Sequence, residues 1–183
     1  KSKKKKKKDQ EEEKVYEEIS NRIAIWLNSL KVEKSNTHPL NHSTIQPLNL
    51  LLHGVTASGK TEVYFKLIDD TIKQGKNVLF LAPEIALASQ LTKRLAKKFG
   101  TDDVAIWHSS ISDGEKYDVW QKLYKNEIRI LAGVRSAVFA PLQNIGLIII
   151  DEEHESAYKQ TTPTPRYDAR TVAKKLAEFH NCP

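Results

Sequence analysis

The 183-residue sequence contains no methionine and a single cysteine, Cys182. One cysteine excludes an internal disulfide and cannot build a four-ligand zinc site. No apolar run approaches the roughly 20 residues that a membrane-spanning helix needs, and no charged, apolar and small-residue leader opens the chain. These absences predict a cytoplasmic location without a membrane partner. The absence of methionine even at position 1 predicts that the chain is a segment of a longer protein.

An excess of charge of one sign is also missing once the first eight residues are set aside. The formal net charge is +6, but seven of the 29 basic residues lie in residues 1–8, which leaves 22 basic against 23 acidic residues. The folded part therefore gives no global electrostatic indication of a nucleic-acid partner. We interpret residues 1–10 as a disordered, solvated tail, with a DNA-phosphate arm as the alternative.

The organisation along the chain changes near residue 48. Residues 11–30 carry apolar side chains at spacings of three and four, which predicts an amphipathic helix, and a polar, proline-containing stretch completes the segment 11–47 as a linker. From residue 48 to residue 183 we predict one α/β domain. The helical stripe consists of Val15, Ile19, Ile23, Trp26, Leu27 and Leu30.

Short, continuously apolar runs alternate with amphipathic segments of helical length in this domain. Continuous rather than alternating apolar runs are typical of parallel strands covered on both faces, so we predict an open, mostly parallel, doubly wound sheet with helices on both faces. Ligands of such sheets bind beyond the carboxyl ends of the strands. The predicted strands are 48–53, 77–82, 104–108, 128–132 and 145–150, and the predicted helices are 61–73, 86–99 and 113–125.

A phosphate-binding loop follows the first apolar run and precedes a helical segment. Residues 54–61 fit the pattern G-x-x-x-x-G-K-[ST], whose backbone N–H groups converge on phosphate oxygens. Lys60 is predicted to reach the β and γ phosphates, and Thr61 to offer its hydroxyl to Mg²⁺. The predicted ATP-binding residues are Gly54, Val55, Thr56, Ala57, Ser58, Gly59, Lys60 and Thr61.

A carboxylate cluster follows the last apolar run, where the sequence reads Asp151-Glu152-Glu153-His154. Asp151 is predicted to hold Mg²⁺ together with Thr61, and Glu152 to polarise the water that attacks the γ phosphate. The alternative for the cluster is a solvated helix start capped by Asp151. His154 is either a surface residue or a sensor of the γ phosphate that couples hydrolysis to DNA.

Several motifs in order resemble the primosomal protein N′ family of replication-restart DNA helicases, in superfamily 2. The resemblance covers residues from about 50 to the end. It rests on the segments 54–64, Leu81-Ala82-Pro83-Glu84-Ile85-Ala86-Leu87, His108-Ser109 with Ser112-Asp113-Gly114-Glu115, 133–141, Asp151-Glu152-Glu153-His154, Tyr158-Lys159-Gln160 and Pro165-Arg166-Tyr167-Asp168-Ala169-Arg170.

The resemblance implies the first RecA-like motor domain of an ATP-dependent 3′ to 5′ DNA helicase that acts in primosome assembly. It implies single-stranded or forked DNA, other primosome proteins and single-strand-binding proteins as partners, and it implies zinc in the full-length family protein but no zinc site in this chain. The residues that it implies for DNA contact are Pro83, Glu84, Arg135, Ser136, Tyr158, Arg166, Tyr167 and Arg170.

The chain does not contain the second RecA-like domain that follows in the family. In two-domain motors that domain supplies the arginine that stabilises the transition state, so we expect weak or no unwinding by these residues alone. Two alternatives stay open. The first is another P-loop NTPase or a kinase that does not act on DNA, and the second is a non-catalytic interaction module with vestigial nucleotide binding.

Overall fold

The structure is a computed structural model that describes residues 10, 12–22, 25, 49–53 and 59–183. The chain divides into two compact units, Lys1–Asp70 with Pro183 and Thr71–Cys182. Much of the predicted phosphate loop, the lysine run and the predicted linker lie outside the described residues. The predicted domain boundary at residue 47 lies there too, and it stays a prediction.

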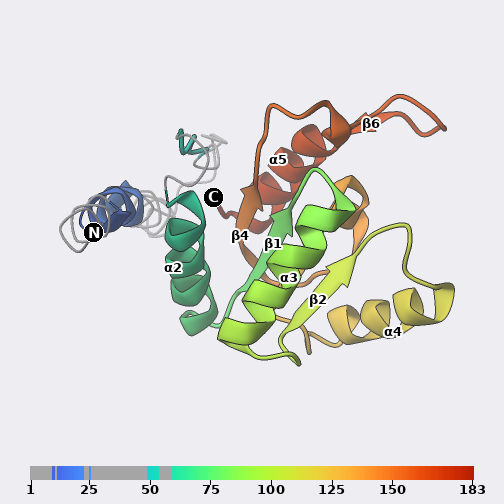
Figure 1. Cartoon of the computed structure of the whole chain (residues 1–183), viewed down its shortest axis with the longest axis horizontal. Helices are drawn as coiled ribbons and strands as arrows, with labels where there is room; N and C mark the ends of the chain where they lie inside the picture. The colour runs from blue at the N-terminus through green and yellow to red at the C-terminus, as the bar shows by residue number, and fades with distance from the viewer. Residues whose placement is uncertain (1–9, 11, 23–24, 26–48, 54–58) are drawn as a thin grey trace, which may run out of the picture. The chain divides into compact units, whose positions relative to one another are not determined.

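A parallel four-stranded sheet forms the centre of the second unit (Figure 1). Its strands are β1 Asn77–Leu81, β2 Val104–Trp107, β3 Ile130–Gly133 and β4 Ile145–Ile150, in the spatial order β2-β3-β1-β4. The inner strands β1 and β3 are buried along their whole length, as their continuous apolar runs predict. Four of the five predicted strands are confirmed, with ends that differ by at most two residues.

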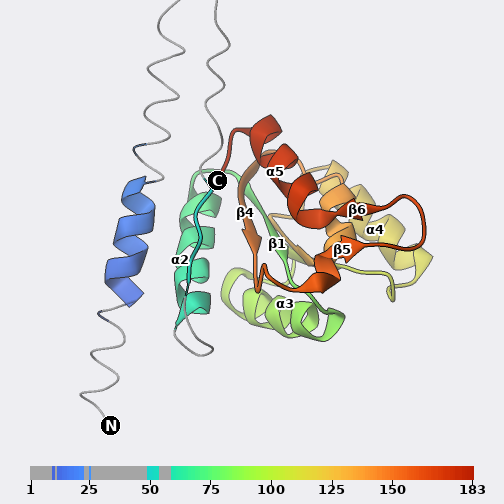
Figure 2. The ribbon, with the colours of Figure 1, turned by 90° about the horizontal axis from the view of Figure 1, so that it is seen from above.

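Helices cover both faces of this sheet (Figure 2). Helix α3, Ile85–Phe99, packs on β2 and β3 from one side, and α5, Ala169–His180, packs on β4 from the other. Helix α4, Asp113–Tyr124, contributes Leu123 to the same buried cluster as α5. The α/β fold with helices on both faces is therefore confirmed.

The core follows from the alternation of side chains along the strands. Leu79 and Leu81 of β1 point to the cluster that α5 closes with three alanines, Ala169, Ala173 and Ala177. The intervening Val78 and Phe80 are also buried, at 0% and 1% exposure, and lie on the opposite face. The small side chains of α5 allow its backbone to approach the sheet closely.

Four short elements surround the carboxyl edge of the sheet. They are the 3-10 helices η1 Arg135–Phe139 and η2 Ser156–Tyr158, and the two-residue strands β5 Lys159–Gln160 and β6 Tyr167–Asp168. Strands β5 and β6 pair antiparallel, and the hairpin between them projects outward (Figure 1).

The amino-terminal edge of the sheet is closed by a polar network. The buried Asn77 donates its amide N–H to the carbonyl of Gln143 at 2.7 Å, and its amide oxygen accepts from Nε of Arg129 at 2.9 Å. Arg129 also donates to the carbonyl of Ile72 at 3.1 Å. This edge is thus occupied by structural hydrogen bonds.

Helix α2, Lys60–Lys73, begins at the end of the phosphate-loop motif, and in the first unit residues 12–22 are helical as predicted. Tyr16 donates its hydroxyl to Asp70 of α2, and Glu13 forms an ion pair with Lys66. The contact is thus made by polar side chains, whereas Val15 of the predicted apolar stripe is 36% exposed. Ile23, Trp26, Leu27 and Leu30 of the stripe lie outside the described residues.

One predicted strand is wrong in the part that is described. Residues 49–53 have no strand hydrogen-bond ladder, and Leu51 is 75% exposed. An apolar run forms a strand only when a neighbouring strand satisfies its backbone groups, and local sequence does not specify that neighbour.

No helix within the described residues is long and apolar enough to cross a membrane.

The close approach of η1 to the sheet predicts a strong effect at Gly133. A Cβ at this position would lie 2.5 Å from the carbonyl oxygen of Trp107 and 2.6 Å from Cβ of Ala137. We expect Gly133→Ala to lower the free energy of unfolding by about 1–3 kcal/mol through overpacking. Urea unfolding measures the change. The control is Gly114→Ala, because a Cβ at Gly114 meets nothing within 4 Å; equal stability of the two variants would contradict the packing argument.

Candidate functional site

The carboxyl edge of the sheet gathers the predicted functional segments. All four strands are parallel, so the segments that follow them start at one edge. The hydrogen bonds between the strands continue into these segments. The N–H of Ala82 donates to the carbonyl of Gly133 at 2.9 Å, and the N–H of Asp151 donates to the carbonyl of Leu81 at 3.0 Å. The first residues of the Pro83-Glu84 and Asp151-Glu152 segments are therefore fixed by backbone hydrogen bonds.

The phosphate-loop motif is described at its carboxyl end. Gly59 has φ +100°, which favours glycine, and its carbonyl accepts the N–H groups of Glu62 and Val63 at 2.9 and 3.3 Å. Lys60 and Thr61 are therefore the first residues of α2. The first backbone N–H groups of a helix and its dipole favour an anion there. Gly54–Ser58 lie outside the described residues, so their contacts with ATP stay predicted.

The Asp-Glu-Glu-His segment forms a turn at the end of β4. Glu152 has φ +47°, a left-handed backbone that is costly for a residue with a side chain, by about 1–3 kcal/mol. The turn is closed by a hydrogen bond from the N–H of Glu155 to the carbonyl of Glu152 at 2.9 Å. Residues 151–154 are thus not a helix start, and the alternative interpretation of this cluster is wrong. Both Asp151 and Glu152 are half-buried.

Tyr158 joins this turn to the central strand. Its side chain is fully buried, with the hydroxyl 2.6 Å from the carbonyl oxygen of Asp151 and 3.1 Å from that of Leu81. The hydroxyl shares its one hydrogen between these two carbonyl oxygens, and the ring packs in the core cluster. The prediction that Tyr158 contacts DNA is therefore corrected, because a ring at 0% exposure presents no face to a base.

Arg170 holds the same turn from α5. Its Nη1 donates to the carbonyl of Glu153 at 2.8 Å, while Nε and Nη2 donate to the two carboxylate oxygens of Asp168 at 2.9 and 2.5 Å. These hydrogen bonds from Arg170 hold the pKa of Asp168 below its usual range. Asp168 also caps α5 by accepting the N–H of Arg170 at 2.9 Å. Much of this guanidinium is therefore used within the fold, and its predicted DNA contact stays a prediction.

The other predicted DNA-contact residues lie on three of the segments around this edge. Arg135 and Ser136 open η1 and are half-buried, and Nη1 of Arg135 donates to the carbonyl of Ala157 at 3.4 Å. Glu84 is exposed at the start of α3. Arg166 is exposed on the β5–β6 hairpin, next to the half-buried Tyr167. The structure thus places them around one edge, although their contact with DNA is untested.

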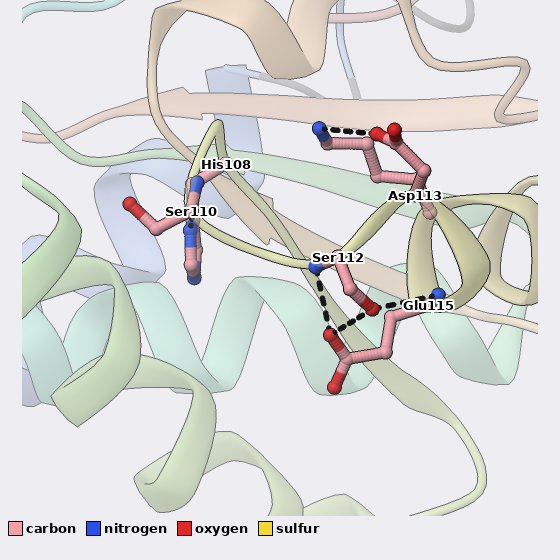
Figure 3. Close-up of polar contacts among 6 residues, drawn as sticks. His108, Ser110, Ser112, Asp113 and Glu115 are labelled. Carbon is pink, nitrogen blue, oxygen red and sulfur yellow. Dashed lines mark hydrogen bonds and ion pairs between the residues drawn. The ribbon is translucent and has the colours of Figure 1, made fainter.

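Two local sets of hydrogen bonds shape the segment after β2 (Figure 3). The buried His108 accepts the N–H of Ser110 at Nδ1, at 3.2 Å. Helix α4 begins with a capping box, in which Ser112 Oγ accepts the N–H of Glu115 at 3.3 Å and Ser112 N–H donates to the Glu115 carboxylate at 2.8 Å. The Ser112 hydroxyl and N–H lower the pKa of Glu115.

His154 is exposed and lies between two carboxylates. Its Nδ1 is 3.8 Å from Glu152 and its Nε2 is 3.6 Å from Glu155, so a protonated imidazole would pair with both. The coupling role of His154 stays a prediction.

The oxygen donors present are compatible with Mg²⁺. Mg²⁺ is usually bound by one or two protein oxygens together with substrate phosphates and water, not by a cage of protein ligands. Within the described residues no group of three or more His, Cys, Asp or Glu side chains gathers to hold a metal. Asp151 at the end of β4 and Thr61 at the start of α2 are oxygen donors of the kind that Mg²⁺ prefers.

Comparison with known protein families matches residues 39–179 to DEAD/DEAH box helicases. The chain is 53% identical over 133 residues to Replication restart protein PriA of Bacillus subtilis, covering 73% of this chain and 16% of that protein. It is 52% identical over 144 residues to Replication restart protein PriA of Synechocystis, covering 76% of this chain and 17% of that protein. The resemblance to replication-restart helicases is confirmed, and the chain spans about a sixth of the length of these relatives.

A solved structure supports the fold. The chain resembles RecG in a complex with a three-way DNA junction, with a TM-score of 0.55 and 23% identity, over 77% of this chain and 23% of that one. Similarity at this level of identity concerns the arrangement of helices and strands, and it agrees with the α/β fold described above.

Phe139 is a residue that the sequence analysis missed. It lies in the quoted segment 133–141, but its 59% exposure and its ring contact with Tyr167 depend on how η1 packs. The sequence around Phe139 does not indicate that its side chain is exposed, because Phe139 is apolar and directly follows the buried Val138.

We predict that the Tyr158 hydroxyl contributes measurably to the free energy of unfolding. Tyr158→Phe removes the donor and leaves the carbonyl of Asp151 without this hydrogen bond, so we expect the free energy of unfolding to fall by about 1–3 kcal/mol. Chemical denaturation measures the loss. Tyr117→Phe is the matched control, because Tyr117 is 63% exposed on α4. If both variants unfold like the native chain, the hydroxyl does not hold the turn.

Proposed function

The chain belongs to the DEAD/DEAH box helicase family, and from this premise we propose that it is the ATP-binding motor domain of a 3′ to 5′ DNA helicase of replication restart. The geometry that supports this best is the turn at residues 151–154, because strand β4, Tyr158 and Arg170 together hold two carboxylates at the carboxyl edge of the sheet. Replication restart is the activity in the names of the relatives.

The proposed nucleotide site combines the phosphate loop with the acidic turn. In this proposal residues 54–59 would wrap the phosphates, Lys60 would contact the β and γ phosphates, and Thr61 and Asp151 would hold Mg²⁺. When bound, Mg²⁺ would neutralise the charge that develops on the phosphate oxygens. The use of ATP and Mg²⁺ follows from the family, and the assignment to these residues is our proposal.

Glu152 is proposed to orient and polarise the attacking water. A carboxylate performs this task when its direction is fixed, since a misplaced base loses much of its effect. The left-handed backbone of Glu152, held between the Asp151 and Glu155 hydrogen bonds, fixes the direction in which its side chain leaves the turn. Strain of this kind is typical of functional residues. We propose that His154, beside Glu152, transmits the state of the nucleotide.

DNA is proposed to lie along the segments that follow β1 and β3 and along the β5–β6 hairpin. Loop N–H groups and the side chains of Arg135 and Arg166 suit a phosphate backbone. We propose single-stranded or forked DNA as the substrate class. Other primosome proteins and single-strand-binding proteins are proposed partners of the longer protein, and its cytoplasmic location stays a prediction from sequence.

A kinase or other P-loop enzyme that does not act on DNA is not favoured, because the family match covers residues 39–179, including the phosphate loop and the acidic turn.

The unwinding activity that we propose for this chain alone is low. Since the relatives are about six times longer than the matched part, we expect this chain to bind ATP but to unwind DNA weakly or not at all.

The phosphate loop is tested by ATP binding. We expect Lys60→Ala to weaken Mg·ATP binding about 10- to 100-fold, because a charge-assisted contact to the phosphates is lost. Titration calorimetry on the whole chain measures the affinity. The control is Lys73→Ala, which removes the same charge from the other end of α2. Unchanged binding by Lys60→Ala would show that the nucleotide binds elsewhere, and no binding by the native chain would contradict the proposed ATP site.

A further inference from the structure

The 3-10 helix η1 turns one large apolar side chain outward. Ala137 and Val138 of η1 are 1% and 3% exposed, whereas the next residue, Phe139, is 59% exposed. Neighbouring positions of the same short helix are thus divided between core and solvent. A single exposed apolar residue is common on protein surfaces. Its surroundings decide whether this one has a use.

Phe139 lies against Tyr167 of the β5–β6 hairpin. The ring centroids are 4.8 Å apart and the ring planes meet at 74°, an edge-to-face arrangement. Such a contact uses the edge of one ring and one face of the other, so Phe139 retains at least one ring face outside it. Tyr167 is half-buried and packs against the core cluster, which anchors the pair.

The hairpin beside this pair is basic. Lys159 and Arg166 are exposed, and residues 159–167 contain no acidic residue. The next acid, Asp168, is paired with Arg170 at 2.5 Å. The positive charge is therefore local, since the sequence beyond the first eight residues carries no net excess of basic residues.

The hairpin is also held in shape. Nε2 of Gln160 donates to the carbonyl of Pro163 at 3.1 Å and to that of Pro165 at 2.9 Å. These two bonds connect both sides of the loop before Arg166. The positions of the cation and of the aromatic pair are thus defined together, which reduces the ordering cost of a ligand that uses both.

We propose that Phe139 and Tyr167 form a base-stacking platform for single-stranded DNA, with Lys159 and Arg166 contacting the adjacent phosphates. The combination of exposed rings with a basic hairpin is the chemistry by which proteins hold single strands without reading their sequence. The inference rests on the proposed function and adds to it a base contact by Phe139, which lies outside the residues implied by the resemblance.

A different aromatic surface on α4 shows what the platform requires. Tyr117, Trp120 and Tyr124 are exposed there, and the last two rings stack at 5.4 Å. The helix, however, carries the acids Asp113, Glu115 and Asp118 against two lysines, Lys116 and Lys122. Exposed rings without an excess of positive charge do not suit a polyanion, so we assign the single strand to the Phe139 surface.

The test is fluorescence anisotropy of a labelled (dT)20 strand with the whole chain, at about 300 mM salt to screen the lysine run. We expect Phe139→Ala to weaken binding about 5- to 100-fold, the range for loss of one stacked base. Phe139→Trp should retain binding. Phe179→Ala is the matched control, because Phe179 is 80% exposed in a similar edge-to-face pair with His180.

A strand that lacks bases separates stacking from a structural effect. On an abasic strand of equal length, Phe139→Ala should bind like the native chain, whereas Arg166→Ala should lose affinity on both strands and reduce the salt dependence by about one phosphate contact. Equal loss by Phe139→Ala on both strands would contradict stacking. Thermal unfolding of each variant confirms that the fold is retained.

The outcomes distinguish the platform from the proposed function. If the native chain binds (dT)20 and Phe139→Ala binds equally well, the platform is wrong and the DNA-motor proposal stands. If the native chain binds neither (dT)20 nor a forked DNA, the proposed DNA function of this chain fails as well. Tighter binding of (rU)20 than of (dT)20 would overturn the assignment to DNA.

Discussion

The carbonyl of Leu81 is the point on which the arrangement of the candidate site depends. It accepts the N–H of Asp151 at 3.0 Å and lies 3.1 Å from the hydroxyl of Tyr158. The end of the central strand, the first residue of the acidic turn and the segment after that turn are therefore joined at one atom. Because this atom is buried, water does not replace a lost partner, and the three segments are constrained together.

The constraint explains how a costly backbone conformation is kept at Glu152. Tyr158 fixes the carbonyl of Asp151 before it, and Arg170 fixes the carbonyl of Glu153 after it. The surrounding fold thus specifies a left-handed residue that local sequence would not favour. Arg135 of η1 donates to the carbonyl of Ala157, and Phe139 of η1 contacts Tyr167 of the β5–β6 hairpin, so η1 is connected to the segments that follow the acidic turn.

The sequence predicted the elements whose signals are local. The runs that form β1 to β4 are continuously apolar, a pattern that is visible in the sequence without knowledge of the packing. It did not predict features set by tertiary packing: the burial of Tyr158, the exposure of Phe139 and the absence of a strand at residues 49–53. The resemblance implied a DNA contact for Tyr158, but the core that surrounds its ring decides its role. The phosphate loop was recognised from a motif whose spacing is dictated by phosphate geometry.

We propose that Asp151 acts on the same Mg·ATP that Lys60 and Thr61 bind. The most direct measurement is the affinity for ATP with Mg²⁺ and with EDTA, in the native chain, in Asp151→Asn and in the exposed neighbour Glu153→Gln. We predict that Mg²⁺ strengthens ATP binding in the native chain and in Glu153→Gln, and that Asp151→Asn loses this enhancement while it keeps the metal-free affinity. Full enhancement by Mg²⁺ in Asp151→Asn would show that the acidic turn takes no part in the nucleotide site.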